Sequence, residues 1–331
     1  MKIDWPSISK ILVHKPDHIG DLLCAAPALA LIRREAKNAK ITAAAMPGAA
    51  PFWQVPGLID EVRPLLGPAW YADLDALSYV RWARAKNFDL LVNFRHDFRD
   101  ILAMRAFGAK IVCTYDHKGL AKYASFKSNV AEDLCETDNH LGLAGSMGLE
   151  AEENYRVESA AADRDFAAST LPADKKCVVF HPFSAAPAKH WPTPRMIETA
   201  RVLGQKGIAV ILVGLKENSA KEIGESCPGL INLVDRTTPG QLLAVVEKAD
   251  LLVAADSGPG HIGPLVGTPV IALMSGTNEA KRWAPKGATV IREEAPCAPC
   301  AKRICDVQGH PCMSGIRPDR VTETVMEMLG R

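Results

Sequence analysis

The chain has 331 residues, 39 Lys and Arg against 38 Asp and Glu, and 48% hydrophobic residues. This length exceeds one ordinary α/β core and suits two domains of roughly 150 residues each. The balanced charge argues against a nucleic-acid partner, and no apolar run reaches the roughly 20 residues that a membrane span needs. Because the N-terminus also lacks the hydrophobic core of a signal peptide, we expect a soluble, cytoplasmic protein.

Strands and helices alternate through the first half of the chain. The patterns predict strands at residues 10–15, 40–45, 61–65, 89–94 and 110–114, and helices at residues 21–35, 72–85 and 99–107. Such alternation is typical of a parallel sheet with helices on both faces. From residue 148 to 175 the strand pattern stops and acidic, alanine-rich sequence follows. We interpret this stretch as the connection to a second domain.

The same alternation resumes in the second half. Strands are predicted at 177–181, 208–213, 231–234, 251–255 and 289–292, with a further strand resuming at 268, and helices at 193–205, 217–223, 239–248 and 318–329. We therefore expect an α/β protein of two Rossmann-like, doubly wound domains facing a cleft. The expected domains are residues 1–165 and residues 166–316 with a cysteine-rich loop at 297–312. A C-terminal helix at 317–331 can pack back on the first domain.

A polar loop interrupts the apolar segment 249–274 directly after a buried strand. Its residues are Asp256, Ser257, Gly258, Pro259, Gly260 and His261. Ser257 can cap the next helix and Pro259 suits its first turn, so free backbone N–H groups would face an anion there. Open α/β sheets bind phosphorylated ligands at this edge, and the loop therefore predicts an anion site. The glycine spacing also matches a dinucleotide fingerprint, but the two prolines and the late position argue against that interpretation.

Three further positions after predicted strands carry chemistry. Gly20 permits close backbone approach, and Asp21 either complements a helix dipole or acts as a general base on a substrate hydroxyl. Lys189, in the loop that begins with Ser184, either neutralises a diphosphate or is an ordinary solvated lysine. Glu217 lies where an acidic residue can accept hydrogen bonds from ribose hydroxyls.

Two patterns suggest metal sites. Asp73-Leu74-Asp75 matches the Asp-x-Asp pattern of metal-dependent sugar transferases, but it falls inside a predicted helix, which argues against a metal. Cys297, Cys300, Cys305 and Cys312 could close a structural zinc or iron site, with His310 as a substitute ligand. Free thiols or a labile disulfide are the alternative. The other five cysteines are scattered, which fits reduced thiols.

In order and spacing, these motifs resemble glycosyltransferase family 9, the ADP-heptose:lipopolysaccharide heptosyltransferases. The resemblance rests on Gly20-Asp21, on Lys189-His190-Trp191-Pro192 and on the loop 256–261, and it runs over nearly the whole chain. It implies a GT-B architecture whose first domain binds mainly the acceptor and whose second binds mainly the nucleotide sugar. It also implies inverting, metal-independent transfer of a heptose to a lipid-linked lipopolysaccharide core sugar, at the cytoplasmic face of the inner membrane.

The resemblance assigns roles to individual residues. Asp21 matches the base, and Lys189 matches the lysine on the donor diphosphate. The residues expected at the donor are Gly20, Ser184, Lys189, Glu217, Asp256, Ser257, Gly258, Gly260 and His261. Arg95, His96 and Arg99, with Lys118 and Lys122, are acceptor-side candidates or solvated surface. Phe183 stands where the family usually has glycine, so the donor sugar stays open, and one subgroup of the family binds iron through four cysteines at a spacing that this chain does not match.

Two other classes of function remain open on the sequence alone. One is a GT-B relative that epimerises or hydrolyses a nucleotide sugar and needs no lipid-linked acceptor. The other is a non-catalytic binding protein organised around the cysteine cluster, which would have no affinity for nucleotides.

Overall fold

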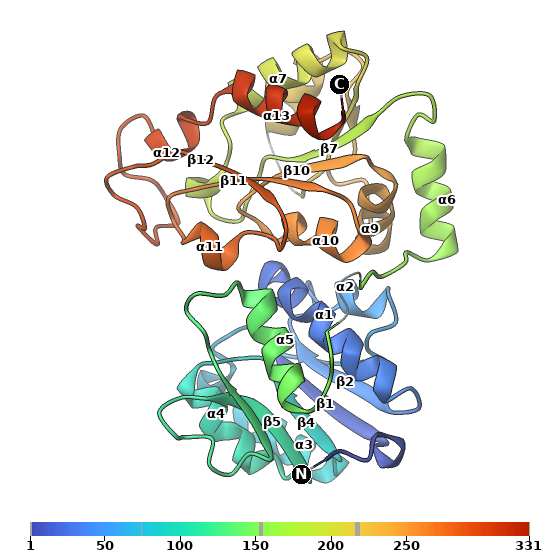
Figure 1. Cartoon of the computed structure of the whole chain (residues 1–331), viewed down its shortest axis with the longest axis vertical. Helices are drawn as coiled ribbons and strands as arrows, with labels where there is room; N and C mark the ends of the chain where they lie inside the picture. Colours follow the sequence, from blue (N-terminus) through green and yellow to red (C-terminus); the bar gives the residue numbers. More distant parts are fainter. Residues whose placement is uncertain (1, 74, 152–154, 216–218, 331) are drawn as a thin grey trace. The chain divides into compact units, whose positions relative to one another are not determined.

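The computed structural model describes residues 2–73, 75–151, 155–215 and 219–330. The chain divides into two compact units, Met1–Tyr155 and Arg156–Arg331, and each has its own six-stranded parallel sheet (Figure 1). Among the described residues, no helix is long and apolar enough to cross a membrane. The two-unit α/β architecture agrees with the alternating pattern in the sequence.

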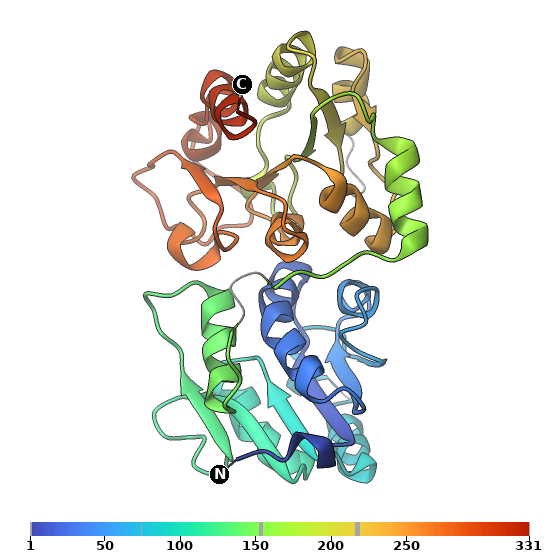
Figure 2. The ribbon, with the colours of Figure 1, turned by 45° about the vertical axis from the view of Figure 1, so that its right-hand side comes forward.

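The first unit contains a sheet in the order β3-β2-β1-β4-β5-β6, with α1 and α5 side by side on one face (Figures 1 and 2). Its central strand β1 has buried residues at five of six positions, as expected for a parallel strand covered on both faces. The strands are β1 (Lys10–Lys15), β2 (Lys40–Ala45), β3 (Glu61–Pro64), β4 (Leu90–Asn93), β5 (Ile111–Asp116) and β6 (Phe126–Asn129). The helices are α1 (Ile19–Glu35), α2 (Pro51–Gln54), α3 (Ala76–Lys86), α4 (Phe98–Met104) and α5 (Glu136–Ser146), with 3₁₀ turns η1 (Trp5–Ser7), η2 (Trp70–Ala72) and η3 (Arg105–Phe107).

The second unit repeats this topology in the order β12-β11-β10-β7-β8-β9. Its strands are β7 (Cys177–His181), β8 (Ala209–Leu212), β9 (Ile231–Asn232), β10 (Leu251–Ala255), β11 (Val270–Met274) and β12 (Thr289–Arg292). Its helices are α6 (Ala161–Thr170), α7 (Thr193–Gln205), α8 (Ser219–Ser226), α9 (Pro239–Lys248), α10 (Ile262–Val266), α11 (Ala280–Trp283), α12 (Pro311–Ser314) and α13 (Pro318–Met328), with 3₁₀ turns η4 (Pro187–Lys189) and η5 (Gly258–His261). All residues of β7, β10 and β11 are buried, so both faces of this sheet contribute to the core.

The boundary between the units lies at residue 155, earlier than the boundary at 165 expected from the sequence. Helix α6 is the reason, because it packs on α9 and so belongs to the second unit. Gly240 permits this approach, since a Cβ there would collide with the Asp163 carboxyl. The Val157 amide, just before α6, also donates to the Leu265 carbonyl at 2.8 Å. Residues 161–170 of the stretch that we interpreted as a connection therefore form a helix that is integral to the second unit.

The C-terminal helix α13 is part of the second unit. It packs on α7, and its residues Val321 and Val325 are fully buried in the core of the second unit together with Phe180 and Met196. The helix therefore covers part of the core of the second unit. The 11-residue α13 presents apolar residues four apart to this core, as an amphipathic helix does.

Two elements near residues 126–146 have no counterpart among the sequence predictions. Strand β6 carries polar residues at a sheet edge, so its sequence lacks a clear apolar period. Helix α5 mixes buried polar and apolar residues, including the fully buried His140. The Asp-x-Asp pattern also differs in detail, because Asp75 precedes α3 and Asp73 lies in the loop before it.

Candidate active site

Each sheet reverses its strand order once, and candidate residues gather at both reversal points. In the first unit the reversal falls between β1 and β4, and in the second it falls between β7 and β10. Loops that leave the carboxyl ends of two such strands diverge, and α/β proteins bind ligands in the crevice that results. The segments that follow these strands carry Asp21 and Arg95 in the first unit, and Lys189 and Asp256 in the second.

In the second unit, an ion pair joins the two loops at the reversal point. Lys189 Nζ lies 3.0 Å from Asp256 Oδ1, and only 18% and 7% of the two side chains are exposed. Lys189 ends the turn η4, whereas Asp256 follows the last residue of β10. The sequence predicted both residues at a donor diphosphate, and the structure brings them together.

Asp256 has polar partners on its other oxygen. The Ser275 hydroxyl donates to Oδ2 at 3.2 Å, and the Thr277 hydroxyl lies 3.4 Å from the same oxygen. Both hydroxyls are buried and follow β11, the strand beside β10. Sequence reasoning missed Ser275 and Thr277, although their place after a predicted strand was an available signal. The carboxylate of Asp256 is thereby held between a cation and two hydroxyls.

Two histidines flank this ion pair as neutral groups. Burial lowers the pKa of His181 and that of His261 to about 4, so both imidazoles are uncharged near pH 7. Ser257 Oγ donates to the Ala255 carbonyl at 3.0 Å and accepts from His181 Nδ1 at 2.9 Å. His181 thus orients the Ser257 hydroxyl at the start of the predicted phosphate loop, a role that the sequence did not assign to it.

The loop 256–261 differs from the helix start that the sequence predicted. Ser257 makes no side-chain capping bond, and the chain forms the short 3₁₀ turn η5 before the five-residue helix α10. Gly260 in this loop and Gly263 in α10 serve close packing, because a Cβ on Gly260 would lie 3.3 Å from Ala254 Cβ and one on Gly263 would collide with Val270. Packing against the strands therefore accounts for Gly260 and Gly263. With so short a helix, positive charge at this site comes mainly from Lys189.

The remaining donor candidates fall in three places. Ser184 lies in the loop before η4, where its hydroxyl accepts from the Ala186 amide at 3.4 Å. Gly20 lies in the first unit, in the first turn of α1 beside Asp21. Glu217 lies outside the described residues. The side chain of Trp191 is 2% exposed and donates to the Ile316 carbonyl at 3.1 Å, which fixes the end of the loop that carries Ser184 and Lys189.

Asp21 is the acidic residue of the first turn of α1. Burial raises the pKa of its carboxyl above 3.8, the nearby negative charge of Asp17 adds to this shift, and the positive charge of Lys15 opposes it. A carboxylate with a raised pKa has a higher affinity for a proton. This property is the one that a general base requires.

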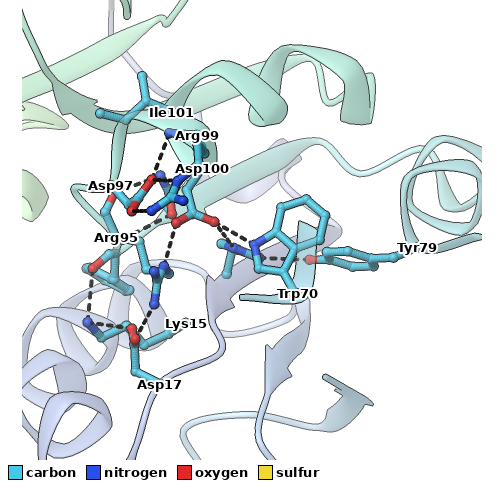
Figure 3. Close-up of polar contacts among 12 residues, drawn as sticks. Lys15, Asp17, Trp70, Tyr79, Arg95, Asp97, Arg99, Asp100 and Ile101 are labelled. Atoms are coloured by element: carbon cyan, nitrogen blue, oxygen red, sulfur yellow. Dashed lines mark hydrogen bonds and ion pairs between the residues drawn. The ribbon is translucent and has the colours of Figure 1, made fainter. Parts of the chain in front are cut away.

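A chain of buried ion pairs lies at the carboxyl ends of the central strands β1 and β4 (Figure 3). Lys15 Nζ lies 3.0 Å from Asp17, Arg95 pairs with both Asp17 and Asp100, and His14 lies 3.0 Å from Asp100. Although burial alone would raise the pKa of Asp100, its bonds from His14 and Arg95 hold that pKa at about 2. Burial lowers the pKa of His14, so a neutral ring donates to an ionised Asp100. Sequence reasoning missed Lys15 and Asp17.

The five acceptor candidates of the first unit have different surroundings. Arg95 is held inside the ion-pair chain, with 11% of its side chain exposed. His96 is more accessible and lies 3.7 Å from the buried carboxylate of Glu136. Arg99 pairs with Asp97 and lies over the ring of Tyr71, 4.5 Å from its centroid. Lys118 and Lys122 are exposed in the loop between β5 and β6.

The structure does not support a metal centre at the cysteine cluster. In the described part of the chain, no group of three or more His, Cys, Asp and Glu side chains is arranged to hold a metal ion. Cys297, Cys300, Cys305 and Cys312 are all free thiols, and Cys312 is buried in the core of the second unit. The prediction of a structural zinc or iron site is therefore unsupported. His310, the proposed substitute ligand, instead hydrogen-bonds the Ala188 carbonyl through Nε2 at 2.9 Å.

Comparisons with known proteins identify the family. The family model described as glycosyltransferase family 9 (heptosyltransferase) matches residues 77–310. The chain belongs to this family. It is 23% identical over 331 residues to lipooligosaccharide heptosyltransferase 2 of Campylobacter jejuni, covering 97% of this chain and 98% of that protein. It is 27% identical over 209 residues to the lipopolysaccharide core heptosyltransferase OpsX of Haemophilus influenzae, a match over 60% of each protein.

Solved structures of family 9 proteins agree with the fold. A family 9 glycosyltransferase from Veillonella parvula superposes with a TM-score of 0.80 at 20% identity, covering 99% of this chain and 98% of that one. The Escherichia coli heptosyltransferase WaaC with ADP superposes with a TM-score of 0.71 at 17% identity, covering 96% and 99%. This family 9 chain is thus a glycosyltransferase with the GT-B fold of two Rossmann-like units.

Proposed function

We propose that the chain transfers a heptose or a related sugar from a nucleotide diphosphate donor, ADP-heptose, to a lipopolysaccharide core acceptor. The observation that carries this proposal is the buried Lys189–Asp256 pair at the strand reversal of the second unit, in a family 9 chain. The relatives named as lipopolysaccharide heptosyltransferases and the solved WaaC structure with ADP support the choice of acceptor and nucleotide.

Lys189 would stabilise the leaving group. When the bond between the anomeric carbon and the diphosphate oxygen breaks, negative charge develops on that oxygen, and a fixed cation lowers the energy of this state. The ammonium of Lys189 is largely shielded from water, which strengthens its effect on a nearby phosphate. Ser257, Gly258, Gly260 and His261 would line the same phosphates. The transfer would require no metal ion, because Lys189 supplies the positive charge.

Asp21 would act as the base in a single displacement. It would take the proton of the acceptor hydroxyl while that oxygen attacks the anomeric carbon on the face opposite the diphosphate. One bond forms as another breaks, so the configuration at the anomeric carbon inverts. The raised pKa of Asp21 suits this role, and Gly20 permits close approach of the substrate to the backbone.

The acceptor would meet the first unit, at the cytoplasmic face of the inner membrane. Helix α4 follows Arg95 and His96 and exposes two apolar side chains one turn apart, Phe98 at 49% and Leu102 at 50%. With Arg99 beside them, these side chains suit peripheral contact with anionic lipid. Replacement of Phe98 and Leu102 by serine should reduce sedimentation with anionic vesicles. Met328→Ser, in the second unit, should leave it unchanged.

The Asp21→Asn variant tests the proposed reaction. We expect its turnover to fall by about 10²- to 10⁴-fold while its affinity for ADP changes little, because the base acts on the acceptor. Asp133→Asn, an exposed change of the same chemistry in the same unit, serves as the control. Near-normal turnover by Asp21→Asn would remove Asp21 from the base role. Rapid loss of donor in the absence of acceptor would favour a nucleotide-sugar hydrolase or epimerase instead.

A further inference from the structure

The cysteine-rich loop contacts both loops of the Lys189–Asp256 pair. We call residues 298–310 the bracing segment. The Ala188 amide, beside Lys189, donates to the Arg303 carbonyl at 3.0 Å. In return, Arg303 Nη2 donates to the Ala185 carbonyl at 3.0 Å, and His310 Nε2 donates to the Ala188 carbonyl at 2.9 Å. Three hydrogen bonds therefore tie the bracing segment to the turn that presents Lys189.

The other end of the bracing segment holds the residues behind Asp256. The amides of Cys300 and Ala301 donate to the carbonyls of Gly276 and Thr277, each at 3.0 Å. Gly276 allows this contact, because a Cβ there would lie 3.1 Å from Ala298 Cβ. The hydroxyls on either side of Gly276 are those that contact Asp256. The bracing segment thus bonds both to the turn that carries Lys189 and to the residues whose hydroxyls contact Asp256.

We propose that the bracing segment fixes the position of Lys189 relative to Asp256 for binding the donor diphosphate, and that Arg303 and His310 are positioning residues. This inference rests on the proposed function. The ammonium of Lys189 must meet a phosphate oxygen while Asp256 stays bonded to the hydroxyls beside it. A displacement of about 1 Å at such a site can lower the rate by about 10²-fold.

The bonds of the bracing segment also account for the conformation of the cysteine-rich loop without a metal. The donors and acceptors are backbone groups, a guanidinium and an imidazole, and none of the five bonds uses a thiol. The side chain of Cys312 instead packs in the core. Positioning by this segment should therefore persist when the thiols are reduced and chelators are present.

The test compares Arg303→Ala, His310→Ala and His310→Gln with the wild type, all with reductant and chelator. Each alanine variant should weaken ADP binding and raise the KM for the donor about 3- to 10-fold, because each loses one bond to the Lys189 turn. The KM for the acceptor should stay within about twofold. His310→Gln should recover most of the loss, since an amide can donate to the Ala188 carbonyl. Hydrogen exchange in the peptide 182–192 should accelerate in the alanine variants only.

Lys302→Ala is the matched control, because Lys302 lies in the same segment and pairs with exposed Asp306. Alanine variants that bind ADP and donor like the control would overturn the inference. Equal loss in His310→Ala and His310→Gln would also overturn the role of the His310 hydrogen bond. Wild-type protein that does not bind ADP would overturn the proposed donor and this inference together. If the wild type binds ADP and Lys189→Ala binds it weakly while both alanine variants bind normally, the inference alone fails.

Discussion

The Lys189→Ala variant removes the attraction between the lysine and the donor diphosphate and leaves the negative charge of Asp256 in place. In the proposed site, the Lys189→Ala variant loses one charge-assisted hydrogen bond to a phosphate oxygen. Such a bond contributes about 1.5–3 kcal/mol. Since about 1.4 kcal/mol corresponds to a tenfold change in affinity, ADP should bind roughly 10- to 100-fold more weakly.

Asp256 contributes a repulsive term of similar size. The pair distance of 3.0 Å implies that a phosphate oxygen on the far side of Nζ lies roughly 5–6 Å from the carboxylate. At that separation, two unit charges repel by about 3 kcal/mol if the effective dielectric constant is about 20. The double variant Lys189→Ala/Asp256→Asn removes this repulsion. It should therefore bind ADP within about tenfold of wild type and clearly more tightly than Lys189→Ala.

Titration calorimetry with ADP on the four proteins of this double-mutant cycle measures both terms. Lys248→Ala provides a charge-matched control, because Lys248 is exposed at the end of α9 that leads into the amino end of β10. Repetition at high salt should weaken ADP binding only modestly, because salt screens buried and partly buried charges much less than exposed ones. A double variant that binds ADP no better than Lys189→Ala would refute the repulsion argument. Unchanged affinity in Lys189→Ala would refute the phosphate contact itself.

Two further predictions concern pH. The acid limb of the kcat/KM profile should report the ionisation of Asp21 and lie above pH 3.8. Lys15→Met should move this limb to higher pH, because it removes a nearby cation. Asp17→Asn should move it to lower pH, because it removes a nearby anion. If the limb moves in the same direction in both variants, Asp21 does not set it. The second prediction concerns His181. As the pH falls from about 6.5 to 4, the imidazole takes up a proton in the unfolded chain and not in the folded chain. The free energy of unfolding should therefore fall by up to about 3 kcal/mol over this range. Denaturant unfolding of His181→Asn should show a shallower decline over that range, and an identical decline would contradict the assignment.

The sequence predicted most of the fold because the central strands have unambiguous patterns. Strands such as β7 and β10 are continuous apolar runs followed by polar loops, and they lie where expected. Prediction failed where burial came from tertiary contacts that no local pattern encodes. Helix α6 is short and rich in alanine, so only its packing against Gly240 of α9 shows that it belongs to the second unit. Helix α13 has a clear apolar stripe, but a stripe does not say which surface it covers.

The candidate site was predictable in its parts but not in its connections. Residue type and position after a strand were enough to select Lys189 and Asp256, whereas their direct ion pair required the structure. Lys15 was not predicted as a site residue, because a lysine that ends a strand normally reaches into solvent. In the structure it is only 4% exposed and is paired with Asp17. The cysteine spacing suggested a metal site because clustered cysteine thiols are common metal ligands. The bonds of Arg303 and His310 have no sequence signature.

The ion-pair chain of the first unit bears on Asp21, the proposed base. A lysine bonded directly to Asp21 would hold its pKa low and make it a poor proton acceptor. Lys15 is bonded to Asp17 at 3.0 Å instead, and Asp17 is in turn paired with Arg95, which Asp100 holds from the other side. Burial raises the pKa of Asp21 and the negative charge of Asp17 adds to this shift, while Lys15, bonded to Asp17, opposes the shift without reversing it. In the second unit the logic is reversed, because there Asp256 is bonded directly to Lys189 and the lysine, not the carboxylate, is the group that would meet the substrate. Equivalent strand-reversal points in the two units can therefore serve different purposes, proton acceptance in the first and anion binding in the second. The difference depends on which charge is neutralised by its neighbours.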